Sequence, residues 1–344
     1  MPRVKRIHIL ISLAFITSVF LTIFKAPLAS SQGLTLFVTP LEGALPVDNP
    51  TSELWRQATA VEIPLSAQNI TKPLSLETRV KSVTARALQN DTQIAILVEW
   101  ADGTQNDSMV RPQDFRDAVA LQFPLAEGQP FFCMGQLGGN VNLWHWKADW
   151  QHDLIARQDM DSQYPNMYVD YYPFADPEAG IQAGVADYQD ANYVPALEAG
   201  NLFANPVHFS PVEDLVAGGF GTLTAQPAEG QNVSGYGEWV EGKWRVIFSR
   251  DLASAEADDV NFAPGKVYSM AFAVWDGANQ ERNGQKSTSQ WVSLQLASAP
   301  PPAGLAEAQA PSTWFTPYHI SLILWGVLIL LFLIGALIYS RLPE

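Results

Sequence analysis

Two distant segments of the chain each join a possible metal-ligating side chain to an aromatic-rich stretch. The first runs from Phe131 to Gln151 (FFCMGQLGGNVNLWHWKADWQ) and contains Met134, and the second runs from Val274 to Lys286 (VWDGANQERNGQK). A thioether and an amine on opposite faces of a porphyrin would fill both axial positions of a haem iron and leave none for a substrate. The pattern therefore suggests a haem pocket, with Met134 and Lys286 as the axial ligands, that serves electron transfer.

Histidine and a second lysine compete with these ligands. Lysine must lose its proton before it can bind iron, which burial and the charge of the metal both favour, whereas histidine is the commoner haem ligand. His145 lies between Trp144 and Trp146 on an expected strand, so it points away from both, toward solvent or toward the pocket. We take His145 as the first substitute for Lys286, and Lys147 as the alternative amine. His152 and His208 lie in irregular segments, His319 lies at the membrane edge where we expect an interfacial role, and His8 in the signal segment is not a candidate.

Cys133 is the only cysteine in the chain. A disulfide within the chain, a cysteine-ligated iron-sulfur cluster, a structural zinc site and a haem attached through C-x-x-C-H are all excluded by this count. Any haem must therefore be held non-covalently, as haem b. Because Cys133 lies between Phe132 and Met134, we expect it to be buried rather than to act as a nucleophile.

Other catalytic or metal-binding motifs do not stand out. Gly219, Phe220 and Gly221 are followed by Thr224 where a dinucleotide fingerprint requires glycine, so we interpret them as a turn. The stretch from Asp276 to Asn279 lacks the ligand spacing of an EF-hand calcium loop. Neither H-E-x-x-H nor G-x-S-x-G occurs. We therefore expect a protein that is not an enzyme by itself.

Both ends of the chain carry apolar segments that predict export and membrane attachment. Residues 1–30 combine a basic start, an uncharged run and small residues, as in a signal peptide, and whether it is cleaved stays open. The uncharged residues 320–339 would span roughly 30 Å as a helix, the thickness of the hydrocarbon layer of a bilayer. We expect a body on the periplasmic side of the inner membrane, anchored in the lipid by this C-terminal transmembrane helix.

Residues 34–298 suit one globular domain, and a Pro/Ala-rich linker at 299–318 separates them from the membrane segment. Removal of the signal segment takes away four basic residues and no acids, so the formal charge of -15 becomes -19. A surface this acidic argues against nucleic-acid binding, because it cannot neutralise phosphates. It is compatible with docking of a basic redox partner.

Within this domain the apolar residues alternate with the period of strands. Residues 83–88 and 93–100 predict one hairpin, and residues 237–240 and 243–248, which flank Glu241-Gly242, predict a second. Many short strands with turn-rich connections indicate an antiparallel β-sandwich. The stretch from Asp149 to Pro211 lacks either period and predicts a long excursion with a short helix. Further strand candidates are 118–123, 141–146, 267–275 and 291–296.

Seven segments together resemble the haem b-binding subunits of periplasmic molybdenum enzymes related to ethylbenzene, dimethylsulfide, chlorate and selenate oxidoreductases. The resemblance covers nearly the whole exported body. In order, the segments are DNPTSELWRQATAVEIPL (48–65), IAILVEWADGT (94–104), FFCMGQ (131–136), VNLWHWKADWQ (141–151), LVAGGFGTLT (215–224), GEWVEGKWRVIFSRDL (237–252) and VWDGANQERNGQKS (274–287).

This resemblance implies a mainly β protein, an antiparallel sandwich that holds one haem b between a methionine and a lysine. The methionine of the family falls on Met134 in FFCMGQ, and its lysine falls on Lys286 at the end of ERNGQKS. The implied role is a relay between a molybdenum catalytic subunit with its iron-sulfur subunit and a c-type cytochrome or a quinone-linked carrier. The C-terminal membrane segment departs from the best-known members, which are soluble, and this puts the set of partners in doubt.

A second hypothesis belongs to a different class. Carbohydrate-binding modules of a related sandwich type also present tryptophans, and on this hypothesis four tryptophans, Trp144, Trp146, Trp239 and Trp244, stack on sugar rings. Sugar binding requires neither Met134 nor Lys286, so these two residues separate a membrane-tethered sugar-binding domain from an electron carrier.

Overall fold

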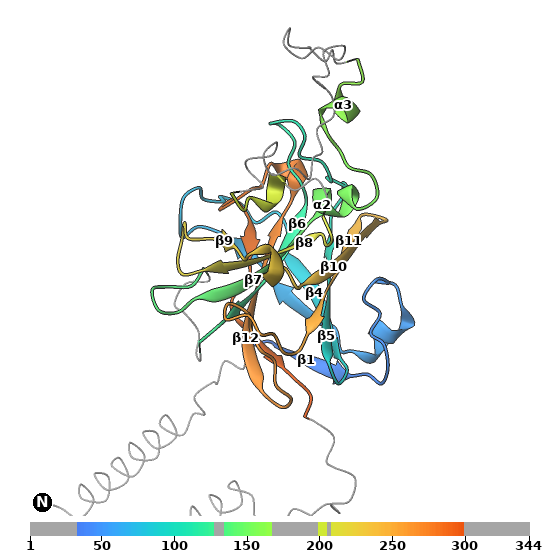
Figure 1. The fold of residues 1–344 in the computed structure, drawn as a ribbon, viewed down its shortest axis with the longest axis vertical. Coiled ribbons are helices and arrows are strands. Elements are labelled where there is room, and N and C mark those ends of the chain that lie inside the picture. The colour runs from blue at the N-terminus through green and yellow to red at the C-terminus, as the bar shows by residue number, and fades with distance from the viewer. Residues whose placement is uncertain (1–32, 127–133, 167–198, 205–207, 299–344) are drawn as a thin grey trace, which may run out of the picture. The chain divides into compact units, whose positions relative to one another are not determined.

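The computed structural model describes residues 33–126, 134–166, 199–204 and 208–298 (Figure 1). Four features that the sequence predicts, the signal segment at 1–30, the linker at 299–318, the membrane helix at 320–339 and the burial of Cys133, lie outside these residues. Within the described part, no helix is both long enough and apolar enough to cross a membrane.

The described residues form strands joined by loops and a few short helices. In chain order the strands are β1 (Thr35–Pro40), β2 (Val61–Pro64), β3 (Ser66–Ala67), β4 (Ser82–Gln89), β5 (Gln93–Ala101), β6 (Ala118–Pro124), β7 (Val141–Lys147), β8 (Val212–Ala217), β9 (Thr224–Ala225), β10 (Ser234–Val240), β11 (Lys243–Asp251), β12 (Val267–Trp275), β13 (Ser287–Thr288) and β14 (Val292–Gln295). The α-helices are α2 (Ala148–Asp153) and α3 (Met160–Gln163), and the 3-10 helices are η1 (Glu53–Gln57), η2 (Leu202–Ala204), η3 (Ala228–Gly230) and η4 (Gly277–Asn279). The mainly β class is confirmed.

Both predicted hairpins are present. β4 and β5 pair antiparallel, and so do β10 and β11. Glu241 and Gly242 join β10 to β11 with φ angles of 52° and 75°. Positive φ at both positions gives a two-residue turn whose twist matches that of the paired strands. Asn90 closes the first hairpin, because its Oδ1 accepts hydrogen bonds from the backbone N–H groups of Thr92 and Gln93.

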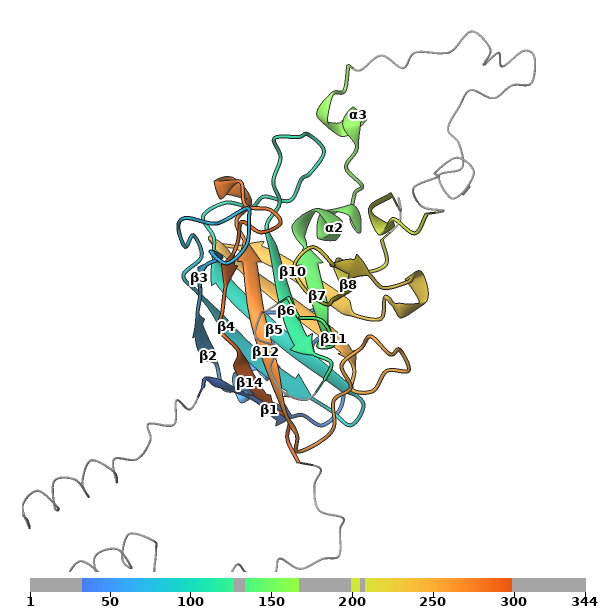
Figure 2. The same ribbon diagram turned by 90° about the vertical axis from the view of Figure 1, so that its left-hand side faces the viewer.

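The strands follow one hydrogen-bonded path in the order β10-β11-β5-β4-β1-β14-β12-β6-β7-β8-β9. This path curls, so that its first part, β10-β11-β5-β4, faces the β12-β6-β7-β8 part across a shared core (Figures 1 and 2). The predicted sandwich is right in its two layers and wrong in being purely antiparallel. β1 runs parallel to both β4 and β14 and joins the layers. A period-two pattern fixes which side chains face the core, but not the direction of a distant partner strand.

Aromatic side chains fill the space between the layers. The ring centroids of Trp100 and Trp244 lie 6.2 Å apart and those of Trp146 and Trp244 lie 5.0 Å apart. Gly237 on β10 makes room for this cluster, because a Cβ there would lie 2.2 Å from Trp146 Cζ2. Trp144 and Trp146 on β7 have no exposed surface at all. They are therefore core residues that hold β7 in place.

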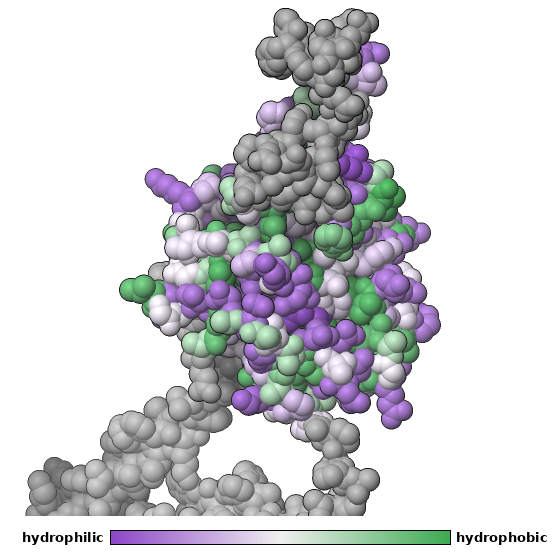
Figure 3. Space-filling view, viewed as in Figure 1, coloured by the Kyte–Doolittle hydropathy of each residue, from purple (hydrophilic) through white to green (hydrophobic). Residues whose placement is uncertain are grey.

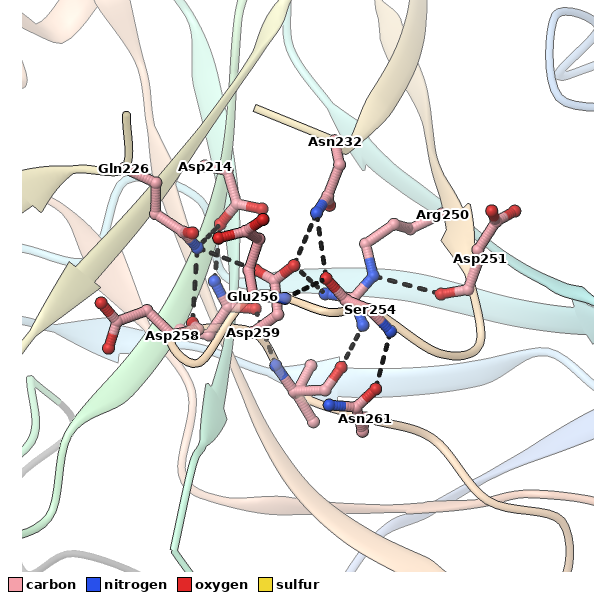
Figure 4. A network of polar contacts seen from close by, with 12 residues as sticks. Asp214, Gln226, Asn232, Arg250, Asp251, Ser254, Glu256, Asp258, Asp259 and Asn261 are labelled. Atoms are coloured by element: carbon pink, nitrogen blue, oxygen red, sulfur yellow. Dashed lines mark hydrogen bonds and ion pairs between the residues drawn. The ribbon is translucent and has the colours of Figure 1, made fainter. Parts of the chain in front are cut away.

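A network of polar side chains around Asp214 and Arg250 lies beside the core (Figure 4). Asp214 Oδ1 accepts hydrogen bonds from Asn142 Nδ2 at 2.6 Å and from Gln226 Nε2 at 2.9 Å. Arg250 forms an ion pair with Asp259 at 3.6 Å. Burial, followed by the charge of Asp259, raises the pKa of Asp214 to about 8. A carboxyl group buried here is therefore tolerated through hydrogen bonds, a retained proton and a nearby guanidinium.

The surface in Figure 3 mixes hydrophilic and hydrophobic residues across one face of the described part. The most exposed large apolar side chains, Leu76, Leu137 and Phe209, lie far apart in the sequence. Hydrophilic residues interrupt the hydrophobic ones in this view, so it shows no continuous apolar face. The side chains on individual strands are more informative.

Candidate metal centre

One surface of the sandwich gathers the predicted ligands. Because Trp144 and Trp146 point into the core, their neighbours on β7 project to the opposite side, away from the other layer. We call this side of the β12-β6-β7-β8 layer the outer face. By strand register its members are Val141, Leu143, His145 and Lys147 on β7, Ala118, Ala120 and Gln122 on β6, Ala271, Ala273 and Trp275 on β12, and Glu213, Leu215 and Ala217 on β8.

Met134 is fixed at one end of the outer face. It is half-buried and packs against an apolar cluster at the ends of β7 and β8, and its carbonyl accepts a hydrogen bond from Gly219 N at 2.8 Å. Gly135 follows with a φ of 76°, and a Cβ there would lie 2.7 Å from Ala217 O. Only glycine lets the backbone approach β8 this closely. The local sequence Met-Gly therefore places Met134 against the outer face.

Lys286 ends a tightly held loop at the other end of β12. The Gln68 backbone N–H donates to Lys286 O at 3.0 Å, and Gln68 Nε2 donates to Gly284 O at 2.8 Å. Trp275 Nε1 donates to Asn283 O at 3.1 Å. The Lys286 Nζ itself lies 4.7 Å from the centroid of the Trp275 ring. The amine is therefore held beside the outer face by a fixed loop and an aromatic neighbour.

The two predicted ligands lie over the same face at different levels of the strands. The cluster that Met134 contacts consists of Val141, Leu143, Leu215 and Ala217. Lys286 contacts Trp275, which the pairing of β12, β6 and β7 puts level with Lys147. Leu143 and Lys147 are separated by roughly 13 Å along β7 at the usual rise per residue. The side chains of Met134 and Lys286 would have to extend toward each other across this distance to bind the same metal. Their binding to one iron stays a prediction.

His145 lies on the outer face between these two levels. Its ring centroid is 4.7 Å from that of Trp275, and its Nε2 is enclosed without a hydrogen-bond partner. Burial, followed by the positive charges of Lys147, Arg116 and Lys286, lowers the pKa of His145 well below its ordinary value of 6.5. His145 points away from Trp144 and Trp146, as the alternation predicted, and lies half-buried beside Trp275, while the identity of this face as the haem pocket stays a prediction. A neutral imidazole with a free nitrogen keeps its place as the substitute ligand.

Lys147 is engaged elsewhere. Its side chain has no exposed surface and forms an ion pair with Glu213 on β8. Its Nζ also lies 3.6 Å from the centroid of the Trp150 ring. Burial is the largest influence on the pKa of Lys147 and lowers it, while Glu213 acts in the opposite direction. These contacts make Lys147 a poor alternative amine, because ligation would leave the Glu213 carboxylate buried without its partner.

The remaining histidines in the described residues lie near α2 rather than between the predicted ligands. His208 stacks on Trp150 with ring centroids 4.1 Å apart, and burial lowers its pKa to about 4. His152 Nδ1 lies 3.3 Å from Asp107 Oδ2. Both have packing or polar partners that account for them. His8 and His319 lie outside the described residues.

The outer face fits a large, flat, mainly apolar group with a metal at its centre. It offers a thioether, an amine and an imidazole, which are all ligands of haem iron or close analogues of them. Alanines occupy four of its positions on β6 and β12, and short side chains allow a flat group to approach the sheet closely. Two enclosed donor or acceptor atoms, His145 Nε2 and Gln122 Nε2, have no hydrogen-bond partner. Such atoms usually have a partner, so the face is suited to a polar edge of a bound group.

Two outer-face residues escaped sequence reasoning. Gln122 is a polar residue on an otherwise apolar strand, and the alternation of Val119, Leu121 and Phe123 already places it on the opposite side. Trp291 precedes β14 and packs against the same cluster as Met134. Its neighbour Val292 is in the core, so alternation puts Trp291 on the outer side. The position of Gln122 could be read from the alternation in the sequence. The position of Trp291 could be found only from the pairing of β14 with β12.

Comparison with known proteins gives an independent line of evidence. Residues 52–287 match the family model described as ethylbenzene dehydrogenase. The heme subunit ORF7 assigned to a respiratory nitrate reductase in Haloferax mediterranei is 26% identical over 265 residues, which cover 76% of this chain and 74% of that protein. The chlorate reductase subunit gamma of Ideonella dechloratans is 22% identical over 254 residues, which cover 72% of this chain and 79% of that protein.

Among solved structures, a family 9 carbohydrate-binding module from Caldicellulosiruptor kristjanssonii has a TM-score of 0.37 at 8% identity and covers 79% of this chain and 98% of that chain. A score this low carries no argument about fold or ligand. The family match, in contrast, spans more than half of the chain and contains both Met134 and Lys286. The chain is a member of the ethylbenzene dehydrogenase family.

Proposed function

We propose that this protein is the haem b subunit of an oxidoreductase complex and that it transfers electrons without catalysing the reaction itself. The observation that carries the proposal is the position of Met134 and Lys286 at two levels of one outer face, with His145 between these levels and Gln122 on the same face. The relatives named as a heme subunit and as a gamma subunit of a reductase support this assignment.

The haem supplies an iron that changes oxidation state by one electron. Met134 and Lys286 would hold the iron as its two protein ligands, and an iron bound in this way would have no position for a substrate. Trp275 and the loop that ends at Lys286 orient the amine, and Gly135 orients the thioether. With Cys133 as the only cysteine, the group is held by these contacts rather than by thioether bonds to the porphyrin.

The proposed setting follows from the ends of the chain and from the family. Residues 1–30 would export the body, and residues 320–339 would anchor it on the periplasmic side of the inner membrane. The proposed partners are a molybdenum-cofactor catalytic subunit and its iron-sulfur subunit on one side, and a c-type cytochrome or another redox carrier on the other. The strongly acidic body is compatible with a basic redox partner.

The alternative of sugar binding loses its physical basis. Trp144 and Trp146 are fully buried and Trp244 is 2% exposed, so none of them can stack on a sugar ring. Trp239 is half-buried, and its Nε1 donates to Asp102 O at 3.1 Å. The tryptophans that suggested a sugar platform instead pack within the sandwich, three of them at its centre.

The proposal is tested on the full chain, purified in detergent from the membranes of its native cells. We expect one non-covalent haem b per chain by the pyridine haemochromogen assay, and co-purification of subunits that contain molybdenum and an iron-sulfur cluster. A colourless chain that stays colourless after addition of haem would contradict the cofactor assignment. A haem-loaded chain that never co-purifies with an oxidoreductase would contradict the proposed complex.

A further inference from the structure

Three aspartates from distant parts of the sequence meet at one end of the sandwich. Asp102 directly follows β5, Asp117 directly precedes β6 and Asp276 directly follows β12. One oxygen from each carboxyl group lies within 4.8 Å of the other two. Asp117 has no exposed surface and Asp102 is 6% exposed, whereas Asp276 is half-buried. An ion held among them would be enclosed on the side of Asp102 and Asp117 and reachable from the side of Asp276.

Asp117 is held in place by three hydrogen-bond donors. The Gly277 backbone N–H donates to Oδ1 at 2.8 Å. The Asn106 backbone N–H donates to Oδ2 at 2.8 Å, and the Trp244 indole N–H donates to Oδ2 at 2.9 Å. Gly277 must be glycine for this approach, since a Cβ there would lie 2.1 Å from Phe115 O. The glycine at 277 therefore lets the backbone N–H come close enough to orient the buried carboxylate of Asp117.

Asp102 leaves one buried oxygen without a partner. Its Oδ1 accepts hydrogen bonds from the Thr104 backbone N–H at 3.1 Å and from Thr104 Oγ1 at 3.3 Å. Its Oδ2 is enclosed and makes no hydrogen bond. The indole N–H of Trp100 is a nearby donor that lowers the pKa of Asp102. It does not form a hydrogen bond of normal distance and angle with any acceptor in the described part of the chain. A buried acceptor of this kind ordinarily has a proton donor or a cation.

No basic side chain in the described residues neutralises the three carboxylates. Arg116 is next to Asp117 in the sequence, but its Nη1 pairs with Asp149 at 2.7 Å. Burial, followed by the charge of Asp102, raises the pKa of Asp117 to about 7. Burial also raises the pKa of Asp102, and Asp276 adds to the increase. Three carboxyl groups this close, without a basic side chain among them, repel one another, and a cation between them would relieve this repulsion.

We propose that Asp102, Asp117 and Asp276 bind a hard divalent cation, and that the ion is Ca²⁺. Carboxylate oxygens are the ligands that Ca²⁺ prefers, and its flexible coordination accepts an irregular set completed by water and backbone oxygens. Mg²⁺ requires a near-ideal octahedron and keeps several waters, which an enclosed site accommodates less easily. The ligands come from three separate connections, so the local spacing rule of an EF-hand loop does not apply to them.

The bound ion would cross-link the loops that frame one end of the sandwich. Asp276 begins the loop that ends at Lys286, and η4 within this loop is capped by the Asp276 side chain, which accepts from Asn279 N. Cation binding would therefore stabilise this loop whether or not haem is present. The proposal does not depend on the assignment of the haem ligands.

The test uses the full chain in detergent, stripped with EDTA and returned to a buffer at about pH 7.5, above the raised pKa of Asp117. Tb³⁺ serves as the probe because Trp244 contacts Asp117 directly and can sensitise its emission. We expect emission that saturates at one Tb³⁺ per chain and is displaced by Ca²⁺. We also expect about 2 mM Ca²⁺ to raise the melting temperature by roughly 5 °C over EDTA, and a weaker effect near pH 5 because protons compete.

Asp102→Asn is the test variant, and Asp214→Asn is its matched control, since Asp214 is also a buried aspartate with one unpartnered oxygen but lies near Arg250. We expect at least a tenfold loss of Tb³⁺ affinity in the first and wild-type affinity in the second. Circular dichroism in EDTA verifies folding, and Asp276→Asn replaces a variant that does not fold. Equal affinity in both variants, or no effect of Ca²⁺ on melting, would overturn the proposal.

Discussion

The two sides of β7 differ in how completely their side chains are satisfied. On the inner side, Trp144 and Trp146 are fully buried, and Trp144 Nε1 donates to Asn142 Oδ1 at 3.0 Å. On the outer side, His145 has an enclosed nitrogen without a partner, and Lys147 forms a buried ion pair with Glu213. The same strand therefore carries a finished core on one side and an incomplete polar arrangement on the other.

This difference indicates what each side is for. Protein interiors leave few buried polar atoms unpaired, because each one costs about 1–3 kcal/mol. On the inner side, the network in Figure 4 satisfies Oδ1 of Asp214 and leaves Oδ2 without a partner, and the raised pKa of this carboxyl group lets it keep a proton instead of a buried charge. The outer side departs from it at His145 and at Gln122, on the face that also carries Met134 and Lys286. A bound group would satisfy the outer side of β7, whereas Trp144 and Trp146 on its inner side already have hydrogen-bond partners.

Truncation on the inner side should have the largest effect on stability. Trp146→Ala removes a fully buried indole that contacts Trp100 and Trp244, so we expect a loss of about 3–5 kcal/mol in the free energy of unfolding. The outer-side variant His145→Ala should cost much less, about 1 kcal/mol or below. Urea unfolding of the full chain in detergent, followed by tryptophan fluorescence, measures both. Equal losses would abolish the distinction between the two sides.

The pH dependence of stability should carry a smaller contribution from Asp214. Its pKa is raised from 3.8 to about 8 in the folded protein, so the folded state holds a proton that the unfolded state releases. The stabilising contribution is therefore present at low pH and is lost as the pH rises from about 4 to about 8, by an amount of order 1–3 kcal/mol.

Asp214→Asn keeps the position neutral at every pH and isolates this contribution. Asp117 titrates in both proteins, so it cancels from the comparison. We expect the variant to lose less stability than the wild type between pH values of about 5 and 8.5, measured by urea unfolding. Identical pH profiles for the two proteins would show that Asp214 is ionised throughout, contrary to the buried network.

Sequence patterns predicted the elements that depend on local chemistry. The turn at Glu241-Gly242 needs positive φ at two adjacent residues, and the alternation along β5 and β7 needs one buried face, so both could be seen in the residues themselves. The parallel pairing of β1 could not, because it depends on β4 and β14, which lie far away in the sequence.

The candidate sites divide in the same way. The sequence predicted from alternation that His145 points away from Trp144 and Trp146, which is confirmed, and it brought forward Met134 and Lys286, whose ligation stays a prediction. It could not place Lys147 against Glu213, since the two meet only when β7 pairs with β8. The cluster of Asp102, Asp117 and Asp276 was equally invisible, because three loop ends separated by up to half the chain bring it together. Motifs with local spacing do not describe such a site.

The most direct measurement of the central claim is the low-spin signature of the haem iron in the full chain and in three single variants. Absorption and electron paramagnetic resonance spectra should show a low-spin iron in the wild type and in His145→Ala. Lys286→Ala and Met134→Ala should each lose it, because one axial position opens. A low-spin spectrum that survives in Lys286→Ala and disappears in His145→Ala would contradict the account and make His145 the ligand.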